Sequence, residues 1–204
     1  MDEKHGNFLL RVYELYNRFG IKSVTMDDVA RELGISKKTL YECITDKKDL
    51  IKLVMEMAYR YHGEKLNDIT TRGLNAMEEL LEVNQYMTRM VKELNPTLMY
   101  DMQKYYPELH NSLMAEQRQR MHDAIQKNLL KGIAEGLYRK EINVEIISRL
   151  HMGRMEYRYR QDAHQLNNID SQEVMREIFI YHLHGIANEK GIQIMNEKLN
   201  SEWK

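Results

Sequence analysis

Two adjacent lysines, Lys47 and Lys48, stand where a long helix is expected to begin, and they could bind an anion. Asp46 is the expected N-cap, and apolar residues follow along one helix face from Leu50 to Tyr61. Positive charge in a first turn opposes the helix dipole, which favours negative charge there. An external anion such as a DNA phosphate, held by free backbone amides and by Lys47, would account for this arrangement. The alternative is that residues 46–49 form a solvated, self-neutralised turn.

A short helix with a polar outer surface is predicted just before these lysines, over residues 37–43. Its outward side chains are Lys37, Lys38, Thr39, Tyr41 and Glu42. Ser36 is a suitable N-cap for this helix. A helix of this length is marginal in isolation, so neighbouring elements must support it.

The elements that position this surface precede it in the chain. Residues 26–33 have helical apolar spacing, and Thr25 with Asp28 three residues later form a capping-box pattern at their start. Gly34 ends that helix, and the short link that follows has about the length of the tight turn in a helix-turn-helix. The apolar residues expected to close a small core are Phe8, Val12, Phe19, Ile35, Leu40 and Ile44.

The sequence over residues 25–51 resembles the DNA-binding region of the tetracycline-repressor-like (TetR) transcriptional regulators. The residues that match the family's pattern in order and spacing are Thr25, Val29, Ala30, Gly34, Ile35, Ser36, Thr39, Leu40, Tyr41, Asp46, Lys47 and Leu50. The resemblance is specific over residues 8–53, about a quarter of the chain, and is architectural beyond them. It implies an all-α protein with an N-terminal three-helix, helix-turn-helix DNA-binding domain at residues 1–50. A long fourth helix would join this domain to a helical ligand-binding and dimerisation domain at residues 51–204.

The resemblance also implies roles for individual residues in binding double-stranded DNA. Tyr41 and Lys47 are expected to contact phosphates, while Thr25 and Ser36 anchor the helix ends on the DNA backbone. The short second helix of the motif would lie in the major groove. The candidates for contact with base edges are Lys37, Lys38 and Thr39, and a lysine suits the O6 and N7 acceptors of guanine.

Several positions depart from the family's pattern. Lys38 occupies a position that often holds a small residue, and Cys43 stands where an aromatic or histidine phosphate contact is usual. Ile44 and Thr45 replace a common phenylalanine–lysine pair. Glu42 adds a negative charge on the same side, where it could accept from a cytosine amino group or repel the DNA backbone.

The N-terminal domain has no net charge, because residues 1–50 hold nine Lys or Arg and nine Asp or Glu. The whole chain has a formal charge of −1, so it has no global attraction to polyanions. Since neutralisation of phosphates dominates affinity for DNA, one such domain would bind weakly. We therefore expect a homodimer that reads a pseudo-palindromic operator in successive major grooves.

The remaining chain is predicted to be helical and to supply the dimer contact. The expected elements are helices after Gly73, at Pro96, at Pro107 and over residues 144–166, and a turn at residues 134–143. Ser171 is the expected cap of a last long helix, whose apolar residues are spread around most of its circumference. Such a helix would be buried on two sides. In the TetR family the last two helices of each subunit form a four-helix dimer interface.

Candidate ligand-binding residues lie in this region. Methionine tolerates repacking, and the methionines that could line a pocket for an apolar ligand are Met87, Met90, Met99, Met102, Met114 and Met121. Ordinary core packing is the alternative for them. His151, Arg154 and Arg158 have helical spacing and could hold an anionic ligand, or could form an exposed or interface stripe. By resemblance, an unknown small-molecule effector would move the fourth helix, change the spacing of the two DNA-binding domains and so release DNA.

No arrangement of catalytic residues is apparent, so neither enzymatic activity nor a cofactor is expected. The sequence has no Glu-x-x-His pair of a di-iron bundle, no glycine-rich phosphate loop and no serine nucleophile elbow. Of the eight scattered histidines, His182 and His184 point in different directions on a helix. A second interpretation is a helical dimer that carries a lipid-like or aromatic ligand and has lost specific DNA binding, which is consistent with the departures at residues 43–45.

Composition sets further limits on the compartment. The single cysteine, Cys43, excludes an intrachain disulfide and a zinc site of several thiolates, which fits a reducing environment. The longest apolar run, Ile178 to Tyr181, is far shorter than the roughly 18 residues that a membrane span needs. The start of the chain lacks the apolar segment of a signal peptide. We expect a cytoplasmic protein that does not enter a membrane.

Overall fold

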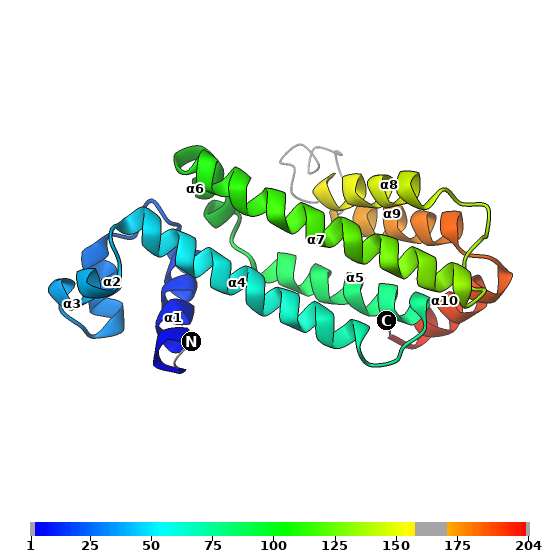
Figure 1. Cartoon of the computed structure of the whole chain (residues 1–204), viewed down its shortest axis with the longest axis horizontal. Coiled ribbons are helices and arrows are strands. Elements are labelled where there is room, and N and C mark those ends of the chain that lie inside the picture. The colour runs from blue at the N-terminus through cyan, green and yellow to red at the C-terminus, as the bar shows by residue number, and fades with distance from the viewer. Residues whose placement is uncertain (1–2, 158–170, 203–204) are drawn as a thin grey trace. The chain divides into compact units, whose positions relative to one another are not determined.

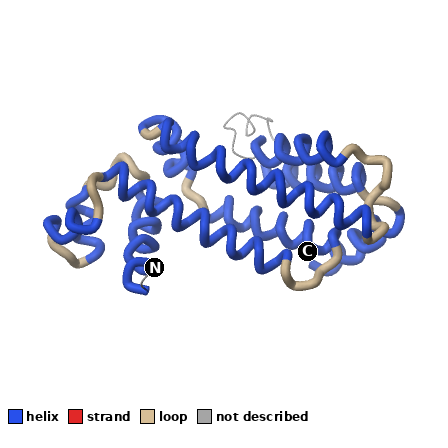
Figure 2. The backbone as a smooth tube through the Cα atoms, viewed as in Figure 1, coloured by secondary structure: helices blue, strands red, loops and turns tan. Residues whose placement is uncertain are grey.

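The structure is a computed structural model that describes residues 3–157 and 171–202. Every regular element in these ranges is an α-helix, and the tube in Figure 2 passes from helix to helix through loops alone. The helices labelled in Figure 1 are α1 (Glu3–Phe19), α2 (Met26–Leu33), α3 (Lys37–Cys43), α4 (Lys47–Thr70), α5 (Ala76–Glu93), α6 (Pro96–Tyr105), α7 (Pro107–Ala134), α8 (Val144–Tyr157), α9 (Ser171–Ile186) and α10 (Glu189–Glu202). The predicted all-α class, with three N-terminal helices followed by a long fourth helix, is confirmed.

The chain forms two compact units. The first unit comprises residues 1–68 and 85–117, and the second comprises residues 69–84 and 118–204. The first unit therefore includes α6 in addition to the predicted DNA-binding domain. The division of roles at residue 50 remains a prediction. None of the described helices combines the length and the apolar character that crossing a membrane would require.

The caps that bound α2 and α3 are those predicted from the sequence. Asp28 N donates to Thr25 Oγ1 at 3.2 Å, and Thr25 N donates to Asp28 Oδ2 at 2.9 Å, which completes the capping box. Gly34 has a φ of 70°, and its N–H reaches the carbonyls of the last turn of α2. Ser36 Oγ accepts from Thr39 N at 3.0 Å and opens α3. The two helices are thus joined by a tight turn.

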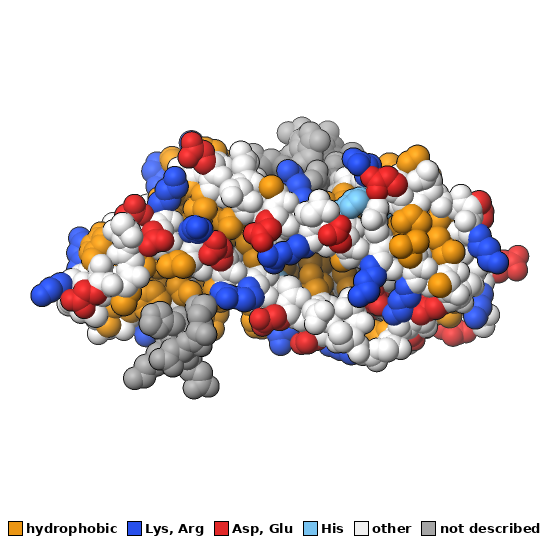
Figure 3. Space-filling model, viewed as in Figure 1, with side chains coloured by type: hydrophobic (Ala, Val, Ile, Leu, Met, Phe, Trp, Pro, Cys, Tyr) orange, Lys and Arg blue, Asp and Glu red, His pale blue; other side chains and the backbone are white. Residues whose placement is uncertain are grey.

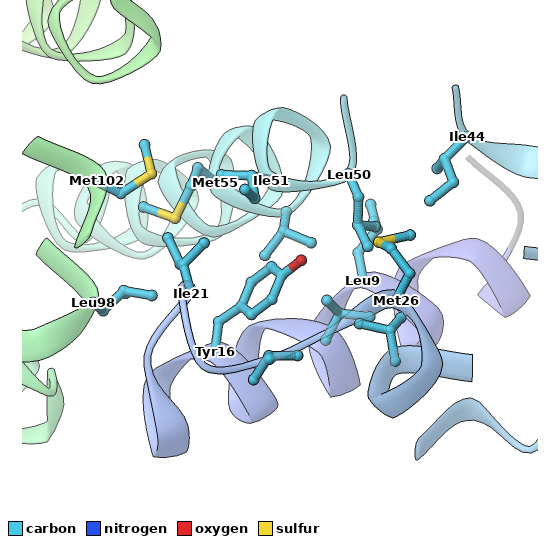
Figure 4. Close-up of a cluster of buried hydrophobic side chains, with 14 of the residues drawn as sticks. Leu9, Tyr16, Ile21, Met26, Ile44, Leu50, Ile51, Met55, Leu98 and Met102 are labelled. Atoms are coloured by element: carbon cyan, nitrogen blue, oxygen red, sulfur yellow. The ribbon is translucent and has the colours of Figure 1, made fainter. Parts of the chain in front are cut away.

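The apolar core of the first unit surrounds Tyr16 of α1, as Figure 4 shows. Val12, Leu40 and Leu50 are fully buried in this core. Phe19 was expected there, and that prediction is wrong: its side chain is 51% exposed, with the Arg18 guanidinium 5.0 Å from the ring centroid. Tyr16 fills the interior instead, and burial raises the pKa of its hydroxyl.

A polar network ties α5 to α7 in the second unit. Asn128 Nδ2 donates to the Ala76 carbonyl at 3.0 Å, and Lys131 Nζ donates to Glu79 Oε2 at 2.7 Å. The Tyr138 hydroxyl lies 3.0 Å from the Ala76 carbonyl and is fully buried, and this burial raises its pKa. Because each of these buried groups has a partner, the network can lie inside the unit without an unsatisfied charge.

Two glycines allow close packing beside this network. A Cβ at Gly132 would lie 2.1 Å from a carbon of the Tyr138 ring, and one at Gly191 would lie 2.3 Å from the Leu137 carbonyl oxygen. An isolated antiparallel bridge pairs Tyr138 with Ala187 in the same place. Side chains at either glycine position would therefore force the two segments apart.

The C-terminal region differs from the prediction. The helix that begins at Ser171 was expected to be the last, but it ends at Ile186 and α10 follows it. Asn188 Oδ1 accepts from Gly191 N at 3.1 Å and so acts as the N-cap of α10. The predicted start of α8 at residue 144 is confirmed. Its predicted extension to residue 166, like Arg158, lies outside the described residues.

Candidate functional site

The short helix α3 presents the polar surface that the sequence predicts. Leu40 is fully buried beneath it, whereas the neighbouring side chains are exposed. The exposed side chains are those of Lys37, Lys38, Thr39, Tyr41, Glu42 and Cys43. Tyr41 keeps 43% of its surface exposed. The helix is thus fixed by one apolar side chain, and its polar residues can meet an external partner.

The two lysines at the start of α3 differ in their surroundings. Lys37 Nζ lies 2.9 Å from Asp27 Oδ2 on α2, and this hydrogen-bonded carboxylate raises the pKa of Lys37. Lys38 is exposed and forms no hydrogen bond or ion pair with any residue that the structure describes. Of these two lysines, only Lys38 therefore has an ammonium group with no protein partner in the described part of the chain.

The predicted anchor residues take part in the local caps. Ser36 Oγ and Thr39 Oγ1 are 2.8 Å apart, so the Thr39 hydroxyl is paired with the cap rather than directed away from it. Thr25 Oγ1 donates to Asp28 Oδ2 at 2.6 Å. These hydroxyls hold the ends of α2 and α3 in place, and contact with DNA is an additional role that remains a prediction.

Lys47 has a structural partner that the sequence analysis did not anticipate. Its Nζ donates to the carbonyl oxygen of Ile21 at 2.6 Å and also to that of Val24. The side chain is half-buried, and burial lowers its pKa. An ammonium carries three N–H donors, so these two bonds leave one for an external phosphate. Lys48 lies 3.7 Å from Glu108 and is exposed, so neither lysine pairs with the aspartates of its own turn.

A contact between α6 and the turn after α1 was also missed. Lys22 N donates to Asp101 Oδ2 at 2.8 Å, and Asp101 is only 4% exposed. Asn17 Nδ2 donates to the Glu93 carbonyl at 3.0 Å. Gly20, with a φ of 79°, lies so close that an added Cβ would be 2.9 Å from Asp101 Oδ2. The backbone between α1 and α2 is therefore held by Asp101 through an amide and by Lys47 through carbonyls.

Charges on the surface are mixed. Figure 3 shows Lys and Arg side chains interspersed with Asp and Glu over the visible face, with no extended basic patch. This agrees with the net charge of −1. Any attraction to DNA must come from a few local cations rather than from a field of one sign.

The predicted ligand residues fall into both units. Met87, Met99 and Met102 belong to the first unit, and Met102 is fully buried in its core beside Leu98, as Figure 4 shows. Met121, His151 and Arg154 belong to the second unit, where Met121 and Arg154 are partly buried and His151 is buried.

His151 and Arg154 lie together in the second unit, and His182 joins them. His151 Nδ1 lies 2.9 Å from His182 Nε2, and Arg154 Nη2 lies 2.8 Å from His151 Nε2. The Arg154 guanidinium also stands 4.9 Å from the centroid of the Phe179 ring. His151 is only 4% exposed, so the alternative of an exposed stripe is wrong for this residue. His182 could not be found from its spacing, because it lies on a different helix.

The environment of His182 keeps its ring neutral. Burial, followed by the nearby Arg154 charge, lowers the pKa of His182 to about 4. His184 on the same helix is exposed, so the two rings point in different directions as predicted. The cluster thus combines two imidazoles with a guanidinium, groups that can bind an anionic or polar ligand.

Comparison with known proteins agrees with this geometry. Residues 13–54, from α1 to the start of α4, match the family described as "Bacterial regulatory proteins, tetR family". The chain is 24% identical over 183 residues to an uncharacterised HTH-type transcriptional regulator, YvaF, of Bacillus subtilis (strain 168), covering 89% of this chain and 95% of that protein.

Solved structures share the fold. A transcriptional regulator from Cytophaga hutchinsonii ATCC 33406 superimposes with a TM-score of 0.72 at 18% identity, covering 92% of this chain and all of that one. A transcriptional regulator from Saccharomonospora viridis, solved in complex with choline, has a TM-score of 0.68 at 16% identity, covering 93% of this chain and all of that one.

These matches and the geometry of α2 and α3 define the class of protein as a helix-turn-helix transcriptional regulator. Residues 13–54 match the tetR family of bacterial regulatory proteins, and the chain as a whole is similar to regulators that carry such a region. The matched family and relatives are regulators rather than enzymes, as the sequence predicted.

Proposed function

We propose that the protein is a ligand-responsive repressor that binds a pseudo-palindromic operator as a homodimer. The observation that carries this proposal is the exposed polar surface of α3, which is held against α2 by a tight turn and by Leu40. A helix presented in this way can enter a major groove of DNA. Lys38 is the lysine best placed to supply a base contact, because its ammonium group is not engaged.

Phosphate contacts would fix the orientation of α3 on DNA. Tyr41 is exposed on α3, and Lys47 retains one donor after its two carbonyl bonds. The N-termini of α2 and α3 begin at Thr25 and Ser36, where backbone amides can face phosphates. These contacts would add affinity without base specificity.

Features of α8 and α9 support a homodimer through these two helices. Ile146 and Leu150, four residues apart on α8, are 56% and 61% exposed, and Tyr181 on α9 is 83% exposed. Gly153 and Gly185 are exposed inside the same two helices. Glycine weakens an isolated helix, but it allows a second helix to approach closely. A partner copy would bury the apolar side chains and make use of the glycines.

We further propose that a small-molecule effector binds in the second unit at Met121, His151 and Arg154, together with His182. The complex of the Saccharomonospora viridis protein with choline gives a precedent for a small molecule on this fold. Met87, Met99 and Met102, which belong to the first unit, remain candidate ligand residues predicted from the sequence. Effector binding would move α4 and change the separation of the two α3 helices, which lowers affinity for DNA. The proposed location is the cytoplasm.

Selection of genomic fragments by the purified full-length protein tests this function. We expect enrichment of one pseudo-palindromic sequence, whose binding weakens steeply as salt rises. The matched variants are Lys38→Met, which should weaken the enrichment, and Lys65→Met, which removes an exposed lysine of α4 beyond the motif and should leave the enrichment unchanged. Binding of small molecules without any enrichment of DNA would favour the alternative of a carrier that has lost DNA binding.

A further inference from the structure

We propose that Asp27 is a specificity-determining residue of the helix-turn-helix. It retains the Lys37 ammonium on the protein surface, so that Lys38 rather than Lys37 supplies the lysine that reads bases. This inference rests on the proposed DNA-binding function. In this proposal the ammonium group of Lys37 is bound by a carboxylate of the protein, whereas that of Lys38 is available to DNA.

The geometry around Lys37 is that of an intramolecular acceptor. Lys37 Nζ lies 2.9 Å from Asp27 Oδ2, and the two residues come from different helices of the motif. Both side chains are partly exposed, at 49% for Lys37 and 63% for Asp27. Solvent and external anions can therefore compete for the same ammonium. A DNA phosphate would have to displace the carboxylate before it could use Lys37 fully.

Asp27 does not take part in the capping box of α2. The neighbouring Asp28 supplies the capping box and pairs with Arg31 at 3.2 Å. Asp27 is thus free to accept from Lys37. Its charge would also repel phosphates near the start of α2, the end at which Thr25 is proposed to meet the DNA backbone. Both effects weaken contacts that depend only on phosphate.

Lys38 is in the opposite situation. It is adjacent to Lys37 on a seven-residue helix, is exposed and has no partner in the described part of the chain. Its ammonium can reach a guanine edge without first breaking an ion pair. The pair of lysines is therefore unequal: one joins α2 to α3, and the other is available to DNA.

The test compares four full-length variants on two DNA probes, a random-sequence duplex and the operator obtained by selection. Asp27→Asn releases Lys37, and Glu56→Gln is its matched control. Glu56 lies 3.9 Å from Lys52 on α4, so its removal changes the net charge equally outside α2 and α3. Lys37→Met and Lys38→Met separate the roles of the two lysines. Affinity is measured over a range of salt concentrations.

With Asp27→Asn we expect the slope of log affinity against log salt on the random duplex to steepen by about 0.9, the value for one further phosphate contact. The ratio of operator to random affinity should fall about three-fold, because only the non-specific contact is gained. Glu56→Gln should leave the slope and the ratio unchanged. Lys38→Met should lower the ratio about ten-fold, and Lys37→Met should change it little.

The proposal is overturned if Asp27→Asn matches Glu56→Gln, or if Lys37→Met costs as much specificity as Lys38→Met. Should Asp27→Asn fail to fold by circular dichroism, the comparison of the two lysine variants decides alone. Nitrogen-15 NMR of the lysine ammonium groups in the free protein reports the ion pair without DNA, through a change in the Lys37 signal on Asp27→Asn. If the wild-type protein binds neither probe while that change occurs, the proposed function itself has failed.

Discussion

Lys47 shows how one side chain can serve folding as well as a proposed contact with DNA. Its two bonds to the carbonyls of Ile21 and Val24 fasten the backbone between α1 and α2. We predict that Lys47→Met, which keeps the long apolar stem, lowers the free energy of unfolding by about 1–3 kcal/mol, because two half-buried carbonyls lose their donor. Urea denaturation measures this change.

The matched control for that prediction is Lys48→Met. Lys48 is exposed and its ion pair with Glu108 spans 3.7 Å, so its loss should change the free energy of unfolding by less than about 0.5 kcal/mol. Equal effects of the two substitutions would show that the Lys47 carbonyl bonds contribute nothing to folding.

His182 makes stability depend on pH. Its pKa of about 4 in the folded protein lies below the unfolded value near 6.5, so below that value the unfolded chain binds a proton that the folded chain does not. The contribution of His182 to the free energy of unfolding is therefore fully present above about pH 6.5 and is lost as the pH falls towards 4. The expected loss from His182 alone, between about pH 8 and about pH 5, is about 2 kcal/mol.

Denaturation of His182→Gln over the same pH range isolates this contribution. The variant should lose less stability on acidification than the wild type by about 2 kcal/mol. His184→Gln, which changes an exposed ring on the same helix, should keep the wild-type pH dependence. A wild-type profile for both variants would contradict a neutral, buried His182.

Single residues were predictable where their surroundings are local. The caps at Thr25 and Ser36 depend on residues three positions away, and the structure reproduces both. Asp27, the partner of Lys37, and His182, a partner of His151, lie on other helices, and the two carbonyls that bind Lys47 lie in the turn between α1 and α2. No spacing within one helix could reveal these contacts. The DNA contacts proposed from the resemblance stay predictions, because they depend on a partner outside the chain.

At the scale of elements, the turn between α1 and α2 is fitted to α6. Gly20 has a φ of 79° and would place a Cβ 2.9 Å from both Asp101 Oδ2 and Thr97 Cγ2. We predict that Gly20→Ala destabilises the protein by about 2–4 kcal/mol, because backbone strain is added to a steric conflict with α6. Thermal or urea denaturation measures this loss.

Gly34→Ala is a matched control in the same unit. Gly34 has a similar φ of 70°, but an added Cβ would meet nothing within 4 Å. It should therefore show only the cost of backbone strain, about 1–2 kcal/mol. If the two alanine variants are equally stable, the contact with α6 is not tight.

N-cap residues, glycines and prolines in the sequence predicted most helix boundaries correctly. The prediction failed where such a signal was missed. The bounds of α3 and the starts of α6 and α7 at prolines agree with prediction. The missed helix α10 does carry a signal, since Asn188 precedes apolar residues at helical spacing, Ile192, Met195 and Leu199. The choice of Phe19 for the core failed because two aromatic residues three positions apart both fit the apolar face of α1.

At the scale of the whole molecule, the proposed homodimer gives a direct prediction. Leu150→Glu places a charge on the exposed apolar face of α8 and should shift the protein to monomer in sedimentation velocity at micromolar concentration. The operator affinity should then fall strongly, because each monomer supplies only half of the contacts.

Leu130→Glu provides the comparison, since Leu130 is 58% exposed on α7, outside the proposed interface. It should sediment as the wild type does. A wild-type protein that is monomeric at all concentrations, or a Leu150→Glu variant that remains dimeric, would argue against association through α8 and α9.

The packing of Tyr138 over Gly132 restricts the order in which this region can evolve. With a Cβ at position 132 only 2.1 Å from the ring, no larger residue can be accepted there while the tyrosine remains. A lineage that replaces the aromatic ring by a smaller side chain first would open position 132 to drift, whereas the reverse order passes through a misfolded intermediate. Deep mutational scanning of both positions together should therefore show tolerated double substitutions. Of the two single substitutions in each such pair, only the one at position 138 should be tolerated by itself.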